Sequence, residues 1–580
     1  MDIEKWLEGV LLEVRKPARY IGNEWNAVKK DFSKQEVRFA ACFPDLYELG
    51  MSNLGLRIIY GLLNEQEGVS CERVFLPDVD MQALLKRDNI PLFSLESKAP
   101  LAEFEFLGFS LSYELGYTNV LAVMDLAGMP LLAKDRDLSY PLVIAGGSCV
   151  SNPEPMADFV DLFLIGEAEE ALLEIIEKYK QIRTTNHEPR ITNHEPRTTK
   201  EDILRSLAKI EGVYVPSFYE AEYNSNGSFQ GLLPKYPDIP VKINKRVVKD
   251  LNQAYYPGKW MVPYIPVVHD RAAVELMRGC PHNCSFCQAK SVYSSLRLRS
   301  PEKVVQLSRE TLSSSGYEEL SFLSLSTSEY PYLNKVIASL GRELEQQGVS
   351  VSLPSLRPKS YLGELSEYLA KVRKTTLTFA PEAGSERMRQ AINKNFSMEE
   401  LFTAVSQAYK NGWQAIKLYF MIGLPGEQES DLDGILEIAR KVSSLKKEFS
   451  RYPAEVRLSL SFFVPKPHTL FEREAMDAEE SLRGKIAYLK DKSRGLSKKI
   501  RLDFHNLKTS ILEAVFSRGS RGLGEAVLKA YRSGCILDGW SEHFKPDIWG
   551  EVFKECSISP DDYLSKKRAE ECLPWRHIVL

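Results

Sequence analysis

Cysteine is scarce in this sequence and unevenly placed. The 580 residues include nine cysteines, too few for the disulfide framework of a secreted scaffold, which favours a reducing compartment. The opening residues, Met-Asp-Ile-Glu-Lys-Trp, lack the basic and apolar regions of a signal peptide. No apolar run approaches the length needed to span a bilayer. We therefore expect a cytoplasmic protein with no membrane segment.

The chain also lacks a strong charge of either sign. Its net charge of -4 gives no overall attraction to nucleic acid or to anionic membranes, so any polyanion site must be a local patch. Hydrophobic residues make up 44% and charged residues 27%, as in ordinary globular proteins. The length exceeds that of one compact core and predicts roughly three or four domains.

Three of the cysteines are clustered in the segment Arg-Gly-Cys-Pro-His-Asn-Cys-Ser-Phe-Cys-Gln-Ala-Lys at 278–290. At this spacing Cys280, Cys284 and Cys287 can face one inorganic centre, and thiolates select zinc, copper(I) or iron-sulfur clusters. Structural zinc wants four protein ligands, and only His282 could complete such a set from within the loop. Three cysteines suit a 4Fe-4S cluster with one open iron. Three unrelated buried thiols are the remaining interpretation.

The C-x-x-x-C-x-x-C run, with Arg278-Gly279 before it and Phe286 before its last cysteine, resembles the signature of the radical S-adenosylmethionine (SAM) enzymes. The resemblance implies that Cys280, Cys284 and Cys287 hold a 4Fe-4S cluster whose open iron is chelated by SAM. One electron, from a donor such as flavodoxin or ferredoxin, then cleaves SAM to methionine and a 5'-deoxyadenosyl radical. The resemblance assigns no substrate.

Residues 1–182 alternate between strand and helix patterns. Strands are expected at 37–43, 104–112, 142–145 and 162–165, and a helix at 52–63 capped by Ser52 or Asn53. This order predicts a doubly wound parallel sheet with ligands beyond the carboxyl ends of its strands. The expected fold class of the chain is therefore α/β.

This first domain is similar to the cobalamin-binding, Rossmann-like domain that precedes the radical SAM domain in one large class of these enzymes. The turns at Gly146-Gly147 and Gly166-Glu167 fit that class. The cobalamin signature Asp-x-His-x-x-Gly appears here as Asp45-Leu-Tyr47-Glu-Leu-Gly50, with Tyr47 in place of the cobalt-ligating histidine. Three hypotheses follow: cobalamin without that ligand, a domain that keeps only the shape and serves as scaffold or substrate clamp, or a capped loop with no ligand. Corrin contacts are expected near Tyr113, Glu114 and Gly116.

Residues 183–200 are expected to form a flexible linker. The run Thr-Asn-His-Glu-Pro-Arg at 185–190 recurs at 192–197, in a polar, proline-containing stretch typical of a surface loop. Its two histidines could suggest a metal site, but a mobile loop gives imidazoles no fixed geometry. Residues 201–270 are expected to form a connecting segment with some β-structure.

Residues 271–470 are interpreted as six strand-helix units that make an open (β/α)6 barrel. Amphipathic segments such as 332–347 and 431–445 separate the strands. Ligands of such barrels bind at the carboxyl ends of the strands. The expected strands are 272–277, 318–326, 349–353, 375–379, 415–421 and 456–463.

Segments after the later strands resemble the SAM-binding elements of the family. The run Ser326-Thr327-Ser328-Glu329 stands where the family has the Gly-Gly-Glu that holds the SAM amino group, so this contact must use different backbone atoms. Each segment alone could be only a turn or a helix cap, but their order argues against coincidence. The resemblance places the ribose and adenine contacts at Glu382, Ser385, Ile422, Gly423 and Val464. Lys466 and His468 are candidates for acid-base chemistry, histidine because its pKa lies near neutrality.

Residues 471–580 are expected to be mostly helical. The runs at 517–524 and 535–540 resemble the C-terminal part of an uncharacterised subfamily of cobalamin-domain radical SAM proteins, whose members often stand beside a further domain. We therefore expect either a shortened C-terminus or a separate partner chain.

A basic helical pattern over 479–510 could contact RNA phosphates or could be a solvated helix face. The rival function from another class is a non-catalytic zinc- and RNA-binding protein that uses the cysteine loop and this helix. Its basic side chains are Arg483, Lys485, Lys490, Lys492, Arg494, Lys498, Lys499 and Arg501.

Overall fold

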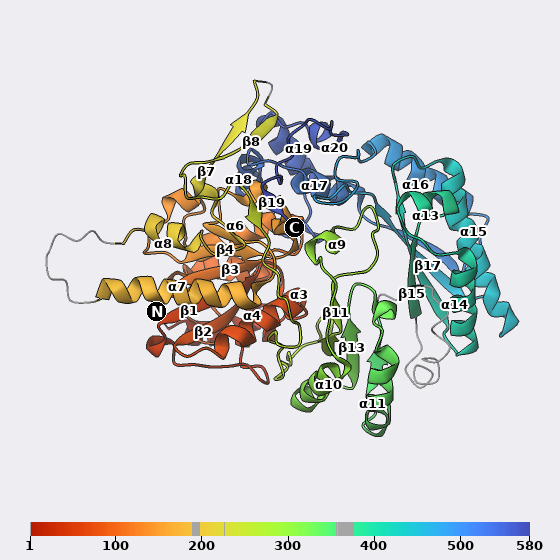
Figure 1. Cartoon of the computed structure of the whole chain (residues 1–580), viewed down its shortest axis with the longest axis horizontal. Coiled ribbons are helices and arrows are strands. Elements are labelled where there is room, and N and C mark those ends of the chain that lie inside the picture. Colours follow the sequence, from red (N-terminus) through yellow and green to blue (C-terminus); the bar gives the residue numbers. More distant parts are fainter. Residues whose placement is uncertain (1, 188–197, 226, 355–356, 358–375) are drawn as a thin grey trace.

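The computed structural model describes residues 2–187, 198–225, 227–354, 357 and 376–580. It consists of an N-terminal α/β unit and a barrel unit that lie side by side (Figure 1). The α/β fold class expected from the sequence is confirmed. No helix in these ranges is both long and apolar enough to cross a membrane.

The N-terminal unit is built on a six-stranded sheet with the order β2-β1-β3-β4-β5-β6. Neighbouring strands are parallel except β5 and β6, which are antiparallel. The winding direction changes between β1 and β3, which is where doubly wound sheets open for a ligand. The strands are β1 (Val37–Phe43), β2 (Val69–Phe75), β3 (Phe106–Ser110), β4 (Leu142–Gly146), β5 (Leu162–Leu164) and β6 (Val213–Tyr214).

Helix caps in this unit follow ordinary polar chemistry. Asn53, rather than Ser52, caps α4, because its side-chain oxygen accepts from the Leu56 N–H at 2.8 Å. Helix α7 continues to His187, into the expected linker, and the rest of the repeat at 188–197 lies outside the described residues. The helices are α1 (Ile3–Val10), α2 (Ala18–Ile21), α3 (Tyr47–Gly50), α4 (Leu54–Asn64), α5 (Val79–Asp88), α6 (Tyr117–Leu126), α7 (Ala168–His187) and α8 (Lys200–Leu207).

The strands of the barrel unit form two parallel sheets among the described residues, β10-β13-β14 and β15-β16-β17-β18. The six expected strands are all present. The strand β18, which pairs with β17, lies where helix was expected, and that expectation was wrong. The strands are β10 (Ala272–Glu275), β13 (Glu319–Leu323), β14 (Ser350–Ser352), β15 (Thr376–Glu382), β16 (Ala415–Ile422), β17 (Glu455–Phe462) and β18 (Ile500–Phe504).

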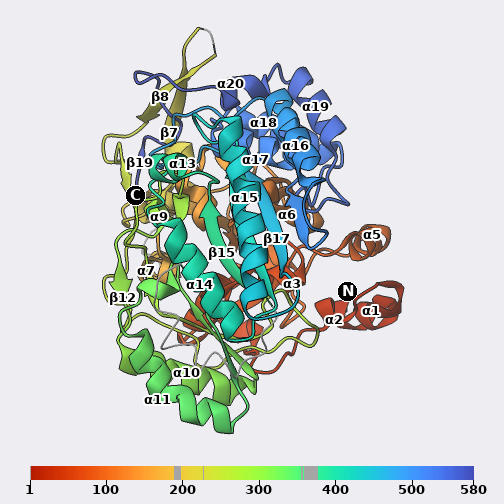
Figure 2. The same ribbon diagram turned by 90° about the vertical axis from the view of Figure 1, so that its right-hand side faces the viewer.

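Helices cover the outer face of these strands (Figure 2). Helix α10 shows why they form where they do. Ser300 caps it by accepting from the Lys303 N–H at 3.2 Å, Pro301 occupies its first turn, and Gly316 ends it with φ +72°. The helices are α10 (Pro301–Ser315), α11 (Leu333–Gln346), α13 (Glu386–Ala391), α14 (Met398–Lys410), α15 (Glu429–Leu445) and α16 (Glu479–Ser493).

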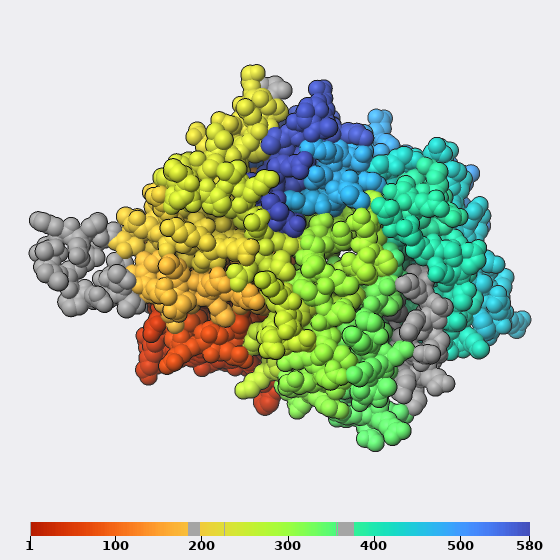
Figure 3. Space-filling model, in the orientation of Figure 1, coloured from red at the N-terminus to blue at the C-terminus, as the bar shows by residue number. Residues whose placement is uncertain are grey.

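The C-terminal helices are shared between the units. Side chains of α17 (Leu507–Ser517), α18 (Leu523–Arg532) and α19 (Pro546–Glu555) belong to the apolar core of the N-terminal unit. Phe516, for example, meets the Trp549 ring at 5.3 Å. Figure 3 shows these C-terminal residues, in blue, between the yellow connecting segment and the barrel unit. The C-terminal region is therefore a joint between the units.

Residues 201–270, predicted to be a connecting segment, contain several short strands, of which β6 belongs to the N-terminal sheet. Strands β7 (Tyr219–Tyr223) and β8 (Phe229–Pro234) form an antiparallel pair. Strand β9 (Ile243–Asn244) pairs in parallel with β19 (Ile578–Val579), near the end of the chain. The short helix α20 (Pro560–Leu564) precedes β19.

Candidate active site

The cysteine loop joins β11 (Met277–Arg278) to α9 (Gln288–Val292). Cys280, Cys284 and Cys287 are free, partly exposed thiols. Burial raises the pKa of Cys280 and of Cys287, and the neighbouring Cys284 raises both further. Within the described ranges no three His, Cys, Asp or Glu side chains are placed, as they stand, to hold a metal ion. The electrostatic effect of Cys284 on the other two thiols shows that the three lie near one another. Three such soft ligands are the donor type that an iron-sulfur cluster takes.

Arg357 approaches this loop from the segment after β14. Its guanidinium lies 3.7 Å from the Cys284 Sγ and 3.0 Å from the His282 Nδ1. The other ring nitrogen of His282 lies 3.2 Å from the Glu329 carboxylate. His282, the candidate fourth zinc ligand, is thus engaged on both sides, which weakens the zinc interpretation.

Segments that follow two other barrel strands also reach the cysteine loop. After β15, the Asn393 side-chain N–H donates to the Ser285 Oγ at 2.9 Å. After β17, the His468 carbonyl accepts from the Ser291 hydroxyl at 2.6 Å, and the Phe471 N–H donates to the Ser285 carbonyl at 3.2 Å. The carboxyl ends of the barrel strands therefore surround the three cysteines.

The run Ser326 to Glu329 lies between β13 and the cysteine loop, in the short helix η9 (Thr327–Glu329) and the residue before it. The Ser326 Oγ is buried and has no hydrogen-bond partner among the residues that the structure describes. Thr327 donates to the Pro354 carbonyl at 2.6 Å, and Ser328 accepts from the Arg357 N–H at 3.2 Å. A buried hydroxyl without a partner is costly, so Ser326 fits a polar ligand group.

The other residues predicted to contact SAM differ in their burial and in the bonds that they make within the protein. Burial raises the pKa of Glu382, whose carboxylate lies 3.3 Å from the Lys394 Nζ. The Ser385 side chain caps α13 and donates to the Asp431 carboxylate. The Gly423 N–H donates to the Glu427 carboxylate at 2.8 Å. Ile422 is fully buried and Val464 partly so.

The two acid-base candidates pack between the units. Burial lowers the pKa of Lys466, but the Glu114 and Glu513 carboxylates, each 2.7 Å from its Nζ, outweigh this and leave that pKa raised. Burial lowers the pKa of His468, whose Nε2 lies 3.0 Å from the Ser151 carbonyl. Lys466 is therefore a permanently charged anchor, poorly suited to proton exchange near neutrality.

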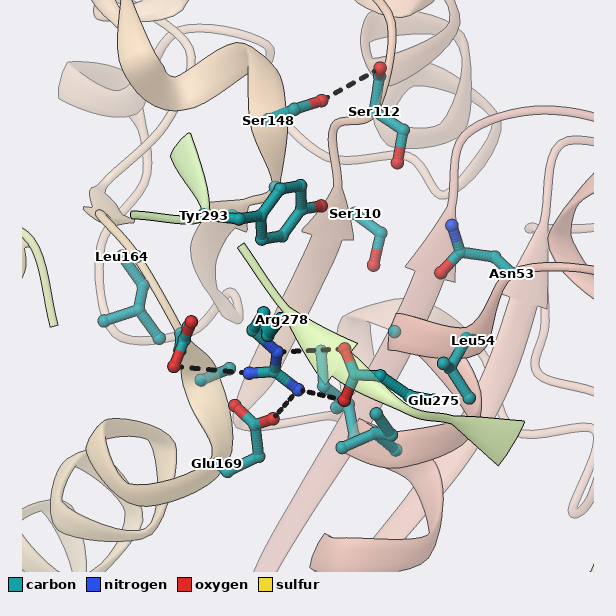
Figure 4. Close-up of a pocket in the computed structure, with 18 of the residues that line it drawn as sticks. Asn53, Leu54, Ser110, Ser112, Ser148, Leu164, Glu169, Glu275, Arg278 and Tyr293 are labelled. Atoms are coloured by element: carbon teal, nitrogen blue, oxygen red, sulfur yellow. Dashed lines mark hydrogen bonds and ion pairs between the residues drawn. The ribbon is translucent and has the colours of Figure 1, made fainter. Parts of the chain in front are cut away.

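A cavity of about 560 Å³ opens between the carboxyl edge of the N-terminal sheet and the base of the cysteine loop (Figure 4). Its sheet side is apolar and its rim carries hydroxyl and amide groups. The opposite wall comes from β10, β11, Tyr293 and the end of β13. Apolar lining residues include Phe39, Ala41, Ile58, Ile144 and Leu164, and polar rim residues include Asn53, Ser110, Ser112 and Ser148.

The predicted glycines Gly146, Gly147 and Gly166 all line this cavity. Gly147 and Gly166 adopt φ values of +112° and +105°, and an added Cβ would approach the backbone of Leu111 or Arg246 within 2.5 Å. At Gly146 the nearest atom to an added Cβ is the Leu164 carbonyl oxygen at 3.6 Å. A side chain at Gly146 would therefore project into open space in the cavity.

The Asp45 to Gly50 motif does not reach the cavity lining. Tyr47 is 2% exposed, donates to Glu24 at 2.8 Å and meets the Phe75 ring edge-on. Asp45 accepts from the Trp540 indole at 2.9 Å, and a Cβ at Gly50 would lie 2.1 Å from Phe75. In this structure Tyr47 and Gly50 pack in the core of the N-terminal unit, and Asp45 binds Trp540 of the C-terminal region.

The predicted corrin contacts after β3 also lie outside the cavity lining. Glu114 pairs with Lys466, and the Tyr113 hydroxyl donates to Glu513 at 3.2 Å. Gly116 lies in the short helix that follows β3. Of the residues expected to meet a corrin, only the three glycines line the cavity.

The chain matches two family models, "Radical SAM proteins, N-terminal" over residues 55–216 and "Radical SAM superfamily" over residues 274–439. The second match includes the cysteine loop and strands β13 to β16 of the barrel unit. This chain is a radical SAM protein. Enzymes of this superfamily use a 4Fe-4S cluster and SAM, and they need an electron donor.

The similar proteins span different parts of this radical SAM chain. An uncharacterized protein of Methanocaldococcus jannaschii is 25% identical over 538 residues, 88% of this chain and 98% of its own length. A tRNA-2-methylthio-N(6)-dimethylallyladenosine synthase of Clostridium novyi is 28% identical over 182 residues, 30% of this chain and 40% of the synthase.

Among the solved structures with a similar fold, one example covers most of this chain. It is TsrM of Kitasatospora setae, a radical S-adenosylmethionine methyltransferase with cobalamin and a [4Fe-4S] cluster bound. It covers 86% of this chain and 99% of its own, with 12% sequence identity and a TM-score of 0.51. At this identity the likeness concerns the fold.

The sequence-based interpretation missed an ion-pair array at the base of the cysteine loop. Arg278 was noted only as part of the motif, and Glu167 only as part of a turn. Glu169 carried no signal in the sequence, because its partner Arg278 lies far along the chain, and Glu275, only three residues before Arg278, was not noted. These four residues all line the cavity.

Proposed function

We propose that Cys280, Cys284 and Cys287 hold the 4Fe-4S cluster, that SAM lies against the barrel strand ends beside them, and that the cavity binds a corrinoid. The observation that supports this best is the position of the cavity. It opens at the carboxyl edge of the N-terminal sheet and is closed on the other side by β11, the strand that leads into the cysteine loop. A cofactor there would face the cluster and SAM.

The lining of the cavity suits a corrinoid. A corrin ring is apolar over its faces and carries amides at its edge, which matches an apolar wall with a rim of Asn53 and serine hydroxyls. No histidine occurs among the lining residues that the structure describes, so the cobalt would bind there without an imidazole from these residues. This supports the first of the three hypotheses for the N-terminal domain.

The residues of this chain would position the reactants and exclude water. Arg357 lies beside Cys284, Ser326 offers a buried hydroxyl to the SAM amino group, and Glu382 a carboxylate to the ribose. When bound, the cluster supplies the electron that cleaves SAM, and cobalamin supplies a cobalt able to carry a methyl group. The proposed reaction class is methyl transfer or another radical modification. Flavodoxin or ferredoxin is the proposed electron donor, in a cytoplasmic setting.

The test is anaerobic reconstitution with iron, sulfide and hydroxocobalamin, followed by desalting and absorbance spectroscopy. Wild-type protein is expected to retain both cluster and corrin. Gly146→Leu should fill the cavity and lose the corrin while it keeps the cluster. The matched control is Gly484→Leu, which adds the same bulk on α16 where nothing lies within 4 Å of the new Cβ. Wild-type protein that retains no corrin would refute the proposed role of the cavity.

The structure gives less support to the zinc- and RNA-binding alternative. Arg483 pairs with Glu479, Lys485 with Glu427, and Arg494 with Asp491, so part of the basic run is already matched by acidic side chains. RNA remains a candidate substrate because one relative is named as a tRNA-modifying synthase. A comparison of modified nucleosides between a deletion strain and its parent tests this, and unchanged nucleosides would exclude it. A separate partner domain at the C-terminus also stays a proposal.

A further inference from the structure

We propose that Arg278 couples the cavity to the cysteine loop, so that a corrinoid in the cavity and the cluster on the loop stabilise each other. This inference rests on the proposed function and adds a physical link between its two cofactor sites. Arg278 acts here as a positioning residue, because its guanidinium binds the carboxylates at the base of the loop.

The link begins at the Arg278 guanidinium, two residues before Cys280. Its Nη2 lies 2.8 Å from the Glu169 carboxylate and 3.0 Å from the Glu275 carboxylate, and its Nη1 lies 3.3 Å from Glu167 (Figure 4). The Arg278 side chain is 8% exposed and those of Glu167 and Glu169 are equally buried. Separating the guanidinium from these carboxylates would leave buried charges uncompensated, so the array resists opening.

The second strand of the loop base is held in the same way. Strands β11 and β12 (Arg297–Leu298) pair antiparallel, with Arg278 opposite Arg297. The Arg297 guanidinium binds both Glu167 carboxylate oxygens, at 2.6 and 2.7 Å. Glu167 follows Gly166, at the carboxyl end of β5. Both strands that carry the cysteine loop are therefore fixed to one turn of the N-terminal unit.

The far end of the loop is anchored to that unit and to the connecting segment. The Lys245 ammonium donates to the carbonyls of Ser291 and Val292, at 3.1 and 3.0 Å, in the last turn of α9. The Gln288 amide donates to the Ser151 Oγ at 2.9 Å. Ser151 ends the short helix η6 (Ser148–Ser151), and Ser148 lines the cavity.

The anchoring residues of the loop base are also cavity wall. Glu167, Glu169, Glu275 and Arg278 all line the cavity, so a ligand that fills it packs against the array that holds the loop. A ligand that stabilises the array also stabilises the loop that holds the cluster. Because coupling between two sites is reciprocal, a cluster that orders the loop must in turn strengthen binding of the ligand in the cavity.

The experiment measures iron release from anaerobically reconstituted protein to a ferrous chelator, with and without saturating hydroxocobalamin. In wild-type protein, cobalamin is expected to slow iron release about tenfold, within the usual range of coupling between sites. In Glu169→Gln the slowing should fall to about twofold or less, as one carboxylate is lost from Arg278. Arg278→Lys keeps the charge without the planar fork and should give an intermediate value. Arg271→Gln, which removes a pair with Glu319 in the barrel sheet, should behave as wild type.

Each result has one meaning. Cobalamin that binds without slowing iron release in wild-type protein overturns the coupling but leaves the proposed cavity function intact. Equal slowing in wild type and Glu169→Gln overturns the route through Arg278. Failure to bind cobalamin overturns the proposed cavity function itself.

A second measurement covers the case in which Glu169→Gln does not fold. Lys245→Gln removes the anchor at the other end of the loop, and hydrogen exchange of residues 280–290 without any cofactor should then be about tenfold faster than in wild type. Unchanged exchange in Lys245→Gln would overturn the anchoring on which the coupling depends.

Discussion

The Arg278 guanidinium lies 2.8 Å from the Glu169 carboxylate, so the residue two positions before the first loop cysteine is fixed by the first turn of α7 in the N-terminal unit. The contact joins residues more than a hundred positions apart. It makes the position of the cysteine loop depend on the N-terminal unit, and the proposals for both cofactor sites lead to the following tests.

The cysteine loop should be the only thiol site needed for the cluster. Cys284→Ala is expected to lose iron and sulfide on anaerobic reconstitution and to abolish reductive cleavage of SAM, because two thiolates do not hold the cluster. Cys556→Ala, at a partly exposed free cysteine that ends α19, is the control and should keep both. Iron analysis and 5'-deoxyadenosine formation are the readouts, and a normal iron content in Cys284→Ala would contradict the proposed ligand set.

Restoring the histidine of the cobalamin signature should not create a cobalt ligand. Tyr47 is buried in the core and bonded to Glu24, away from the cavity lining. Tyr47→His should leave the absorbance of bound corrin unchanged and lower the free energy of unfolding by about 1–3 kcal/mol, because Glu24 loses a buried partner. A shift of the corrin spectrum toward imidazole ligation would instead show that the motif reaches the cofactor.

Lys466 should matter for stability more than for proton transfer. Lys466→Met leaves the Glu114 and Glu513 carboxylates without their shared cation and should lower the free energy of unfolding by about 3–5 kcal/mol. Lys466→Arg keeps the charge and should retain most activity. Loss of SAM cleavage in Lys466→Arg with unchanged stability would restore the acid-base hypothesis.

Acid should weaken the docking of the C-terminus through His577. Burial lowers the pKa of His577 to about 4, below its usual value near 6.5, so the unfolded chain binds the proton more readily than the folded one. The contribution of neutral His577 to the free energy of unfolding is complete above pH 6.5. It is lost as the pH falls toward 4, by at most about 3 kcal/mol. Denaturant midpoints at pH 7 and pH 5 should differ more in wild type than in His577→Gln. Equal differences would exclude His577 as the source.

Much of the fold could be predicted from local signals in the sequence. Strand β1 and helix α4 have the expected places because an apolar run and a capping asparagine are local signals. Strand β18 was missed because its alternation, Ile-Arg-Leu-Asp-Phe with the first residue buried, lies inside a basic run that resembled a helix. Strand β2 was missed although all seven of its residues are buried, because its polar residues Ser70, Glu72 and Arg73 obscure the apolar pattern.

The sequence by itself determined the chemistry of the centre: three cysteines at fixed spacing on one loop, before a series of parallel strand-helix units. That information is local, because ligand spacing and strand periodicity are properties of neighbouring residues. Only the tertiary structure decided that Tyr47 is a core residue, that Lys466 is an ion-paired anchor and that the cavity adjoins the base of the cysteine loop. These facts depend on contacts between distant segments, such as Arg278 with Glu169 and Lys466 with Glu114 and Glu513. Packing sets such contacts, and no spacing in the sequence encodes them.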